Sequence, residues 1–141
     1  MSPFTSNHVK LINDAYPASA DLSTANPLPS ASSNHLGKLT FYAAGRPKKL
    51  PKVAGVLLER AEKEGRSTSG AKGRGGLAVT LDIFKGLVTE CRSELRCFAD
   101  QALRAVELGL TRREGQRRDP QMEARAASLV SSRSRHVARV Y

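Results

Sequence analysis

The chain has no tryptophan, and only seven of its 141 residues are aromatic. Its hydrophobic content of 40% is enough for helices to pack against one another, but it is thin for a large independent core. No apolar stretch approaches the roughly 18 to 20 residues that span a bilayer. The first seventeen residues also lack the continuous apolar segment of a secretory signal peptide. We therefore expect any contact with a membrane to be peripheral.

Residues that build metal or catalytic sites are also scarce. Cys91 and Cys97 are six positions apart, on different faces of a helix, and no second pair of metal ligands stands near them. This predicts two free thiols in a reducing compartment. None of the three histidines, His8, His35 and His136, neighbours a side chain arranged as an activated nucleophile. We therefore predict that the chain is not an enzyme and holds neither a metal nor a cofactor.

A glycine-rich basic stretch, GRSTSGAKGRGG, occupies residues 65 to 76. It has the composition of a phosphate-binding loop, but it lacks the Gly-Lys-Ser or Gly-Lys-Thr ending of a P-loop. A helical pattern rather than a strand precedes it, so it does not match a dinucleotide-binding turn either. We interpret it as a flexible loop.

Apolar residues recur at helical spacing along most of the chain. In KKLPKVAGVLLERAEKE they repeat every three or four positions, and Pro51 is tolerated in the first turn of a helix that begins near Lys49. On this helix Arg60, Lys63 and Glu64 are expected to face water.

The longest periodic pattern runs from Leu77 to Val106. It predicts two successive helices of roughly 15 residues each, with a boundary near Arg92, although one longer helix fits as well. No strand pattern extends over more than a few residues.

Composition divides the chain into four segments. Residues 1 to 17 are expected to form a short helix, and residues 18 to 33, rich in Ala, Ser and Pro, a linker that buries too little to stay ordered. Residues 34 to 110 carry paired amphipathic helices, and residues 111 to 141 a charged segment and a disordered tail. We predict an all-α fold that forms the start of a helical solenoid.

Positive charge is the strongest functional signal. The chain has 23 Lys and Arg against 13 Asp and Glu, a net charge of +10, which favours a polyanionic partner. Cations concentrate around the start of one helix, where they oppose the helix dipole and so do not stabilise that helix. The predicted binding patch consists of Lys10, Lys38, Arg46, Lys48, Lys49 and Lys52.

Two kinds of polyanion fit this patch. An acidic lipid surface contributes about 1 kcal/mol for each nearby Lys or Arg. Nucleic acid would use the same charges through counterion release, here or in the segment from Arg112 to Arg139. Base stacking needs exposed aromatic residues, whereas Phe41 is predicted to lie in the core, and no nucleic-acid-binding signature is present. We favour lipid and keep a nucleic-acid-binding module as the alternative.

Three stretches carry a resemblance to a known family: HVKLINDAYP, KKLPKVAGVLLERAEKE and GGLAVTLDIFKGLVTECRSEL. Together they resemble the N-terminal end of the fungal eighty-five-requiring family, which is related to the animal rolling-blackout proteins. The resemblance covers roughly residues 4 to 130. It implies an armadillo- or HEAT-like rod of stacked helices without enzymatic activity.

The resemblance also implies a location and partners. Members of the family are scaffolds on the cytoplasmic face of the plasma membrane, where a basic surface binds acidic phospholipids of the inner leaflet. They recruit the phosphatidylinositol 4-kinase complex through an adaptor subunit, largely with a C-terminal part that this sequence lacks. The first 90 residues contain no cysteine, so anchoring is expected to rest on charge. The tail SSRSRHVARVY departs from the repeat pattern, and we interpret the chain as a truncated N-terminal portion.

Overall fold

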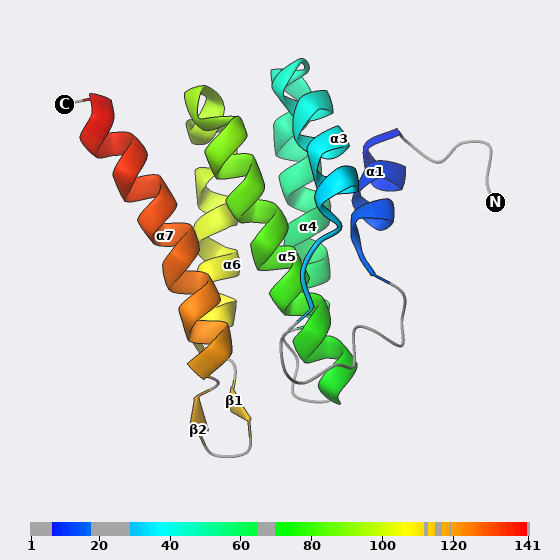
Figure 1. Ribbon diagram of the computed structural model, residues 1–141, viewed down its shortest axis with the longest axis vertical. Coiled ribbons are helices and arrows are strands. Elements are labelled where there is room, and N and C mark those ends of the chain that lie inside the picture. Colours follow the sequence, from blue (N-terminus) through cyan, green and yellow to red (C-terminus); the bar gives the residue numbers. More distant parts are fainter. Residues whose placement is uncertain are drawn as a thin grey trace.

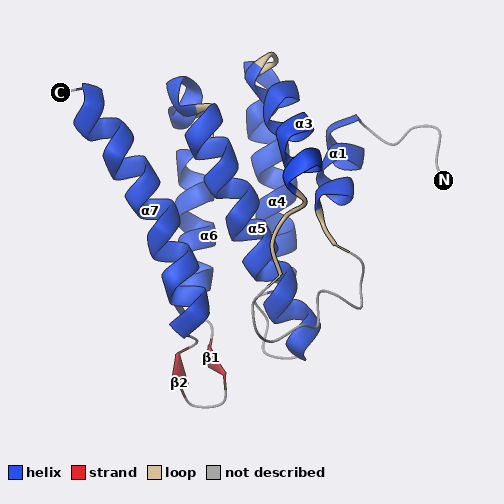
Figure 2. Cartoon of the chain, viewed as in Figure 1, coloured by secondary structure: helices blue, strands red, loops and turns tan. Residues whose placement is uncertain are grey.

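The structure of the chain is a computed structural model that describes residues 7–17, 29–64, 70–111, 113–114, 117–118 and 120–140. The elements in chain order are α1 (Asn7–Ala15), α3 (Ser33–Ala44), the 3-10 helix η1 (Pro47–Lys49), α4 (Leu50–Glu64), α5 (Gly70–Glu90), the 3-10 helix η3 (Arg92–Cys97), α6 (Ala99–Thr111), β1 (Arg113–Glu114), β2 (Arg117–Arg118) and α7 (Pro120–Val140). The two strands form a single antiparallel pair of two residues each. Helices make up nearly all of the described chain (Figure 2), and the predicted all-α class is confirmed.

The helices lie side by side, with α5 at the centre of the array (Figure 1). Helix α5 contacts α3, α4, α6 and α7, and α1 packs against α3 and α4. Two predicted boundaries are confirmed. Helix α4 begins at Leu50, with Pro51 in its first turn, and η3 separates α5 from α6 at Arg92.

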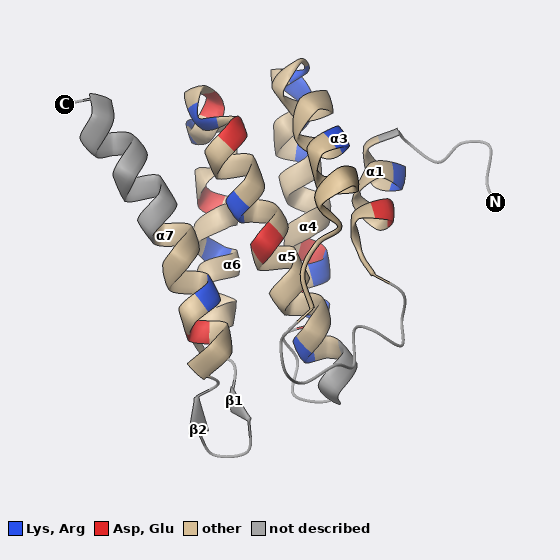
Figure 3. Cartoon of the chain, in the orientation of Figure 1, with Lys and Arg blue, Asp and Glu red and all other residues tan. Residues whose placement is uncertain are grey.

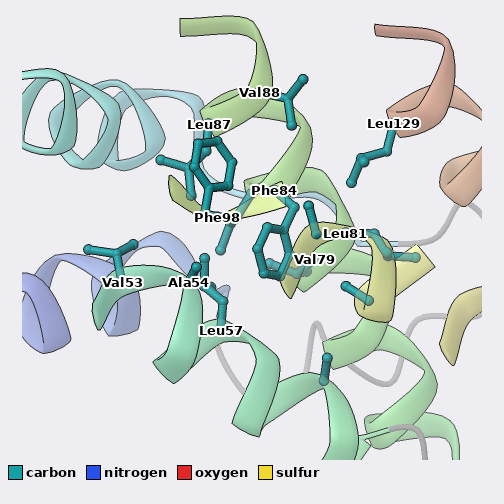
Figure 4. Close-up of a cluster of buried hydrophobic side chains, with 14 of the residues drawn as sticks. Val53, Ala54, Leu57, Val79, Leu81, Phe84, Leu87, Val88, Phe98 and Leu129 are labelled. Carbon is teal, nitrogen blue, oxygen red and sulfur yellow. The ribbon is translucent and has the colours of Figure 1, made fainter. Parts of the chain in front are cut away.

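The core contains buried side chains from α1, α3, α4, α5, α6 and α7, together with Phe98 between η3 and α6. Phe84 and Phe98 pack near one another at its centre, surrounded by the aliphatic side chains of Figure 4. Each of these two aromatic side chains is fully buried. Burying a Phe or Leu side chain stabilises a fold by about 2 kcal/mol relative to leaving it exposed, so these contacts hold the helices together.

The glycine-rich segment is helical where the structure describes it. Helix α5 begins at Gly70, and Gly73, Gly75 and Gly76 are buried. The predicted flexible loop is therefore wrong for residues 70–76, while residues 65–69 lie outside the described part. The absence of side chains lets α5 approach α4 closely, because a Cβ atom on Gly76 would collide with the Glu64 carboxylate. Glycine here serves helix packing rather than loop flexibility.

The end of the predicted linker is fixed in place. The Ser32 N–H donates to the Ala15 carbonyl at 3.0 Å, and the Ala31 N–H donates to the Asp82 carboxylate at 3.0 Å. These bonds tie the segment before α3 to α1 and α5. The prediction of disorder is therefore wrong for residues 29–33, and residues 18–28 lie outside the described part.

Helix α7 runs from Pro120 to Val140, so the prediction of a disordered tail is wrong for residues 131–140. Met122, Ala126 and Leu129 recur at helical spacing on α7 and are buried, and α7 packs against α5 and α6. Arg125 Nη1 donates to the carbonyls of Ala78 at 3.1 Å and of Pro29 at 2.5 Å. Helical packing therefore continues past residue 110. The buried apolar residues of α7 pack against α5 and α6, and Arg125 forms hydrogen bonds with residues far away in the sequence.

Substituting two glycines by alanine tests the packing of the helices. The two substitutions should change the stability of the fold in opposite directions. Gly55 is exposed within α4, and a Cβ atom there would meet nothing within 4 Å. We expect Gly55→Ala to stabilise the fold by about 1 kcal/mol through helix propensity. A Cβ atom on Gly109 would lie 2.9 Å from the buried Leu81 Cδ1 and 3.4 Å from Ala126 Cβ. Because of that crowding we expect Gly109→Ala to destabilise by about 1 kcal/mol, as measured by urea unfolding.

Equal stabilisation by the two substitutions would contradict the close contact of α6 with α5 and α7.

Candidate functional site

The six predicted cations lie on elements that are neighbours in the fold. Lys10 is on α1, Lys38 on α3, Arg46 between α3 and η1, Lys48 and Lys49 on η1, and Lys52 in the first turn of α4. Figure 3 shows basic residues on α1, on α3 and in the turn between α3 and α4, and these elements contact one another in the array. Five of the six are exposed and Lys49 is half-buried. We call these six residues the basic surface.

An aromatic ring contacts one cation of the basic surface, and a buried imidazole lies within the electrostatic reach of two others. The guanidinium carbon of Arg46 lies 4.4 Å from the centroid of the Tyr42 ring, a distance at which a cation is attracted to the ring face. His8 of α1 is buried, and burial followed by the positive charges of Lys49 and Lys52 lowers its pKa. The start of α1 therefore faces the start of α4, and the two elements present their cations together.

The positive charge of the basic surface is not compensated locally. The sequence contains no Asp or Glu between Asp21 and Glu59. Helix α1 carries one acid, Asp14, whereas α3 and η1 carry none. In the part of the chain that the structure describes, none of the six cations forms a salt bridge. The surface therefore presents a positive field to solvent.

Phe41 lies beside the basic surface and not in the core. Its side chain is 82% exposed, so the prediction that it is a core residue is wrong. The register of α3 explains the difference, because this helix buries Leu39, Thr40 and Ala43 against its neighbours. Phe41 falls on the opposite stripe, one turn after Lys38. Sequence reasoning missed this residue because an apolar side chain at helical spacing looks the same on either stripe of a short helix.

A second cluster of polar side chains joins α1, α4 and α5. Thr80 Oγ1 lies 2.8 Å from Glu64 Oε1, and it is also hydrogen-bonded to the Tyr16 hydroxyl. The Arg60 guanidinium lies over the Tyr16 ring, 3.6 Å from its centroid, and donates to Asn13 Oδ1 at 2.7 Å. The prediction that Arg60 and Glu64 face water is wrong, because Glu64 is only 15% exposed and Arg60 is 30% exposed.

This polar cluster links α1, α4 and α5 through side chains that, except for Asn13, are buried or half-buried. Burial raises the pKa of Glu64 to about 7, against the opposing effects of the Thr80 hydrogen bond and the Arg60 charge. Burial, followed by the neighbouring Glu64 charge, also raises the pKa of Tyr16. No histidine or cysteine takes part in the hydrogen bonds and ion pair that the described residues make here.

Two further kinds of site are not found in the described residues. No group of three His, Cys, Asp or Glu side chains lies close enough together to hold a metal ion. No helix among them combines the length and apolar character that crossing a membrane requires. Cys91 and Cys97 are free, and Cys91 is buried.

The raised pKa of Glu64 predicts a pH-dependent stability. An ordinary carboxyl with a pKa of 4.5 in the unfolded chain binds fewer protons near pH 6 than Glu64 does in the fold. Stability from this group is therefore present below pH 4.5 and is lost as the pH rises through about 7. As the pH rises between those limits, the wild type should lose stability and Glu64→Gln should not. The free energy of unfolding of the variant should then exceed that of the wild type by at most about 3 kcal/mol.

Urea unfolding at a series of pH values measures this difference. Glu59→Gln, at an exposed position on the same helix, is the matched control and should follow the wild type. Parallel profiles for Glu64→Gln and the wild type would show that Glu64 is not buried as described.

Most of the chain is similar to known proteins. No protein-family model matches it. It is 39% identical over 131 residues to Protein EFR3 of Mycosarcoma maydis, which covers 87% of this chain and 13% of that protein. It is 36% identical over 108 residues to Protein EFR3 of Cryptococcus neoformans, and 34% identical over 102 residues to Protein EFR3 of Saccharomyces cerevisiae. The chain thus spans about an eighth of the length of these relatives.

A solved structure agrees with the sequence matches. The crystal structure of Efr3 superposes with a TM-score of 0.75 at 26% identity, covering 92% of this chain and 22% of that one. The predicted helical-solenoid fold is confirmed by this match to a helical-repeat protein. The predicted resemblance is confirmed as well. The chain belongs to the EFR3 family and matches part of the length of its members.

Proposed function

We propose that the chain is the membrane-docking part of a non-enzymatic scaffold, and that the basic surface binds acidic phospholipids on the cytoplasmic face of the plasma membrane. The observation that carries the proposal is the set of six cations on neighbouring elements of the helical array, without a salt bridge among the described residues. Within the longer proteins of the family, such an attachment would hold the remaining helices at the membrane, where they recruit the phosphatidylinositol 4-kinase complex through its adaptor.

The size of the electrostatic attraction fits a peripheral attachment. Each Lys or Arg near an acidic leaflet contributes about 1 kcal/mol, so the six together supply about 6 kcal/mol. This corresponds to a dissociation constant on the order of tens of micromolar in accessible lipid. The attachment would be reversible and sensitive to salt, because mobile ions screen the charges of an exposed surface.

Removing three cations of the basic surface should weaken vesicle binding. We expect the triple variant Lys48→Ala, Lys49→Ala, Lys52→Ala to bind vesicles containing phosphatidylserine or phosphoinositides about a hundred-fold more weakly than the wild type. Sedimentation with such vesicles measures the affinity. Vesicles of phosphatidylcholine alone should bind neither protein.

A matched triple variant distinguishes the effect of the basic surface from the effect of the net charge of the chain. Arg92, Arg96 and Arg104 are exposed and lie on η3 and α6, so replacing them with Ala removes the same number of charges elsewhere. We expect this control to keep most of the affinity. Equal losses in the two triple variants, or equal binding to acidic and neutral vesicles, would contradict the proposal. Binding of the wild type to RNA or duplex DNA at low salt, without binding to acidic vesicles, would favour the nucleic-acid alternative.

A further inference from the structure

Phe41 is the large apolar side chain most exposed among the described residues. It is 82% exposed, whereas Leu103, Leu110 and Val130 are between 37% and 42% exposed and lie on α6 and α7. Phe41 is also the single aromatic residue of this group. An aromatic ring so exposed adds almost nothing to the core, and it is accessible to a partner outside the described residues.

The surroundings of Phe41 let its ring stand clear of the helix. Apart from Lys38, the exposed residues three or four positions from Phe41 are small: Gly37 and Ala44 on α3, and Gly45 directly after it. A Cβ atom added to Gly37 would meet nothing within 4 Å, so the space over the preceding turn is open. Pro47 on η1 and Pro51 in the first turn of α4 are exposed as well. The ring is therefore the most prominent part of a small apolar area.

Cations lie at both ends of this apolar area. Lys38 is one turn before Phe41. After Phe41, the Gly45 N–H donates to the Phe41 carbonyl at 3.2 Å and closes the last turn of α3, and Arg46 is the next residue. Lys48 follows on η1. A partner that covers this area must offer negative charge around an apolar centre. An acidic bilayer does so, since its phosphates surround the acyl chains that an inserted ring reaches.

We propose that Phe41 inserts its ring into the interfacial layer of an acidic bilayer while the basic surface binds the headgroups. The inference rests on the proposed function and adds an apolar anchor to it. It orients the protein with the exposed stripe of α3 against the membrane and with α6 and α7 turned away from it (Figure 1). Charge then brings the protein to the leaflet, and Phe41 supplies a part of the affinity that salt does not screen.

Tryptophan substitution tests the insertion directly. The chain contains no Trp, so Phe41→Trp places a single tryptophan, which can be excited selectively, at this position of the full 141-residue chain. On vesicles of phosphatidylcholine and phosphatidylserine we expect its emission to shift to shorter wavelength, and we expect quenching by lipids brominated near the headgroup. Leu103→Trp on α6 is the matched control, at an exposed position away from the basic surface, and should show neither change.

Each other outcome of this experiment overturns the insertion. If Phe41→Trp sediments with acidic vesicles but its emission is unshifted and unquenched, the ring stays in water while the proposed function stands. If the protein does not sediment at all, both inferences fail. A shift that grows with protein concentration and needs no vesicles would assign Phe41 to a contact between two copies of the chain.

Truncation of the ring gives an independent measurement. We expect Phe41→Ala to weaken binding to acidic vesicles about ten-fold, and Phe41→Leu to retain most of the affinity. The deficit of Phe41→Ala should persist when salt is raised, since it comes from apolar burial. Because the side chain is exposed, neither substitution should alter the helical circular dichroism spectrum. Wild-type affinity in Phe41→Ala would overturn the proposal.

Discussion

The burial of α5 is the constraint on which the other elements depend. This helix contacts α3, α4, α6 and α7, and its residues from Gly73 to Leu81 are buried. Its glycine-rich first half lets α4 approach, and its middle anchors the segment before α3 through Asp82. Once α3 is held in this register, Leu39 and Ala43 must face inward, and Lys38 and Phe41 must face solvent. The candidate membrane surface is thus a consequence of how the core is packed.

The charged residues of the chain fall into two groups with different physical roles. Glu64 and Arg60 sit among partners that link α1, α4 and α5, and their removal is expected to act on stability. Lys38 and Lys48 are exposed and make no salt bridge within the described residues. Exposed cations without such a salt bridge, next to an exposed aromatic side chain, contribute little to the stability of the fold. Binding to a partner therefore explains their presence better. This contrast supports the proposed function independently of the relatives.

Local patterns in the sequence were enough to predict the helices, the start of α4 near Pro51 and the break near Arg92. Several features were missed, and most of them depend on contacts between residues far apart in the chain. The glycine-rich segment is helical because α4 packs on it, and α7 is ordered because Arg125 bonds to Ala78 and Pro29. Phe41 is exposed because its neighbours on α3 fill the available contacts. The six residues of the basic surface lie on elements that contact one another, and their lipid-binding role remains a prediction.

The central claim is that one side of the chain, formed by α1, α3, η1 and the start of α4, lies against an acidic bilayer. Hydrogen–deuterium exchange of the full chain with and without vesicles containing phosphatidylserine tests it most directly. The account predicts slower exchange in peptides covering residues 34 to 52, and unchanged exchange in peptides from α6 and from residues 120 to 130 of α7. Protection confined to α6 and α7, or none anywhere while the protein is bound, would contradict it.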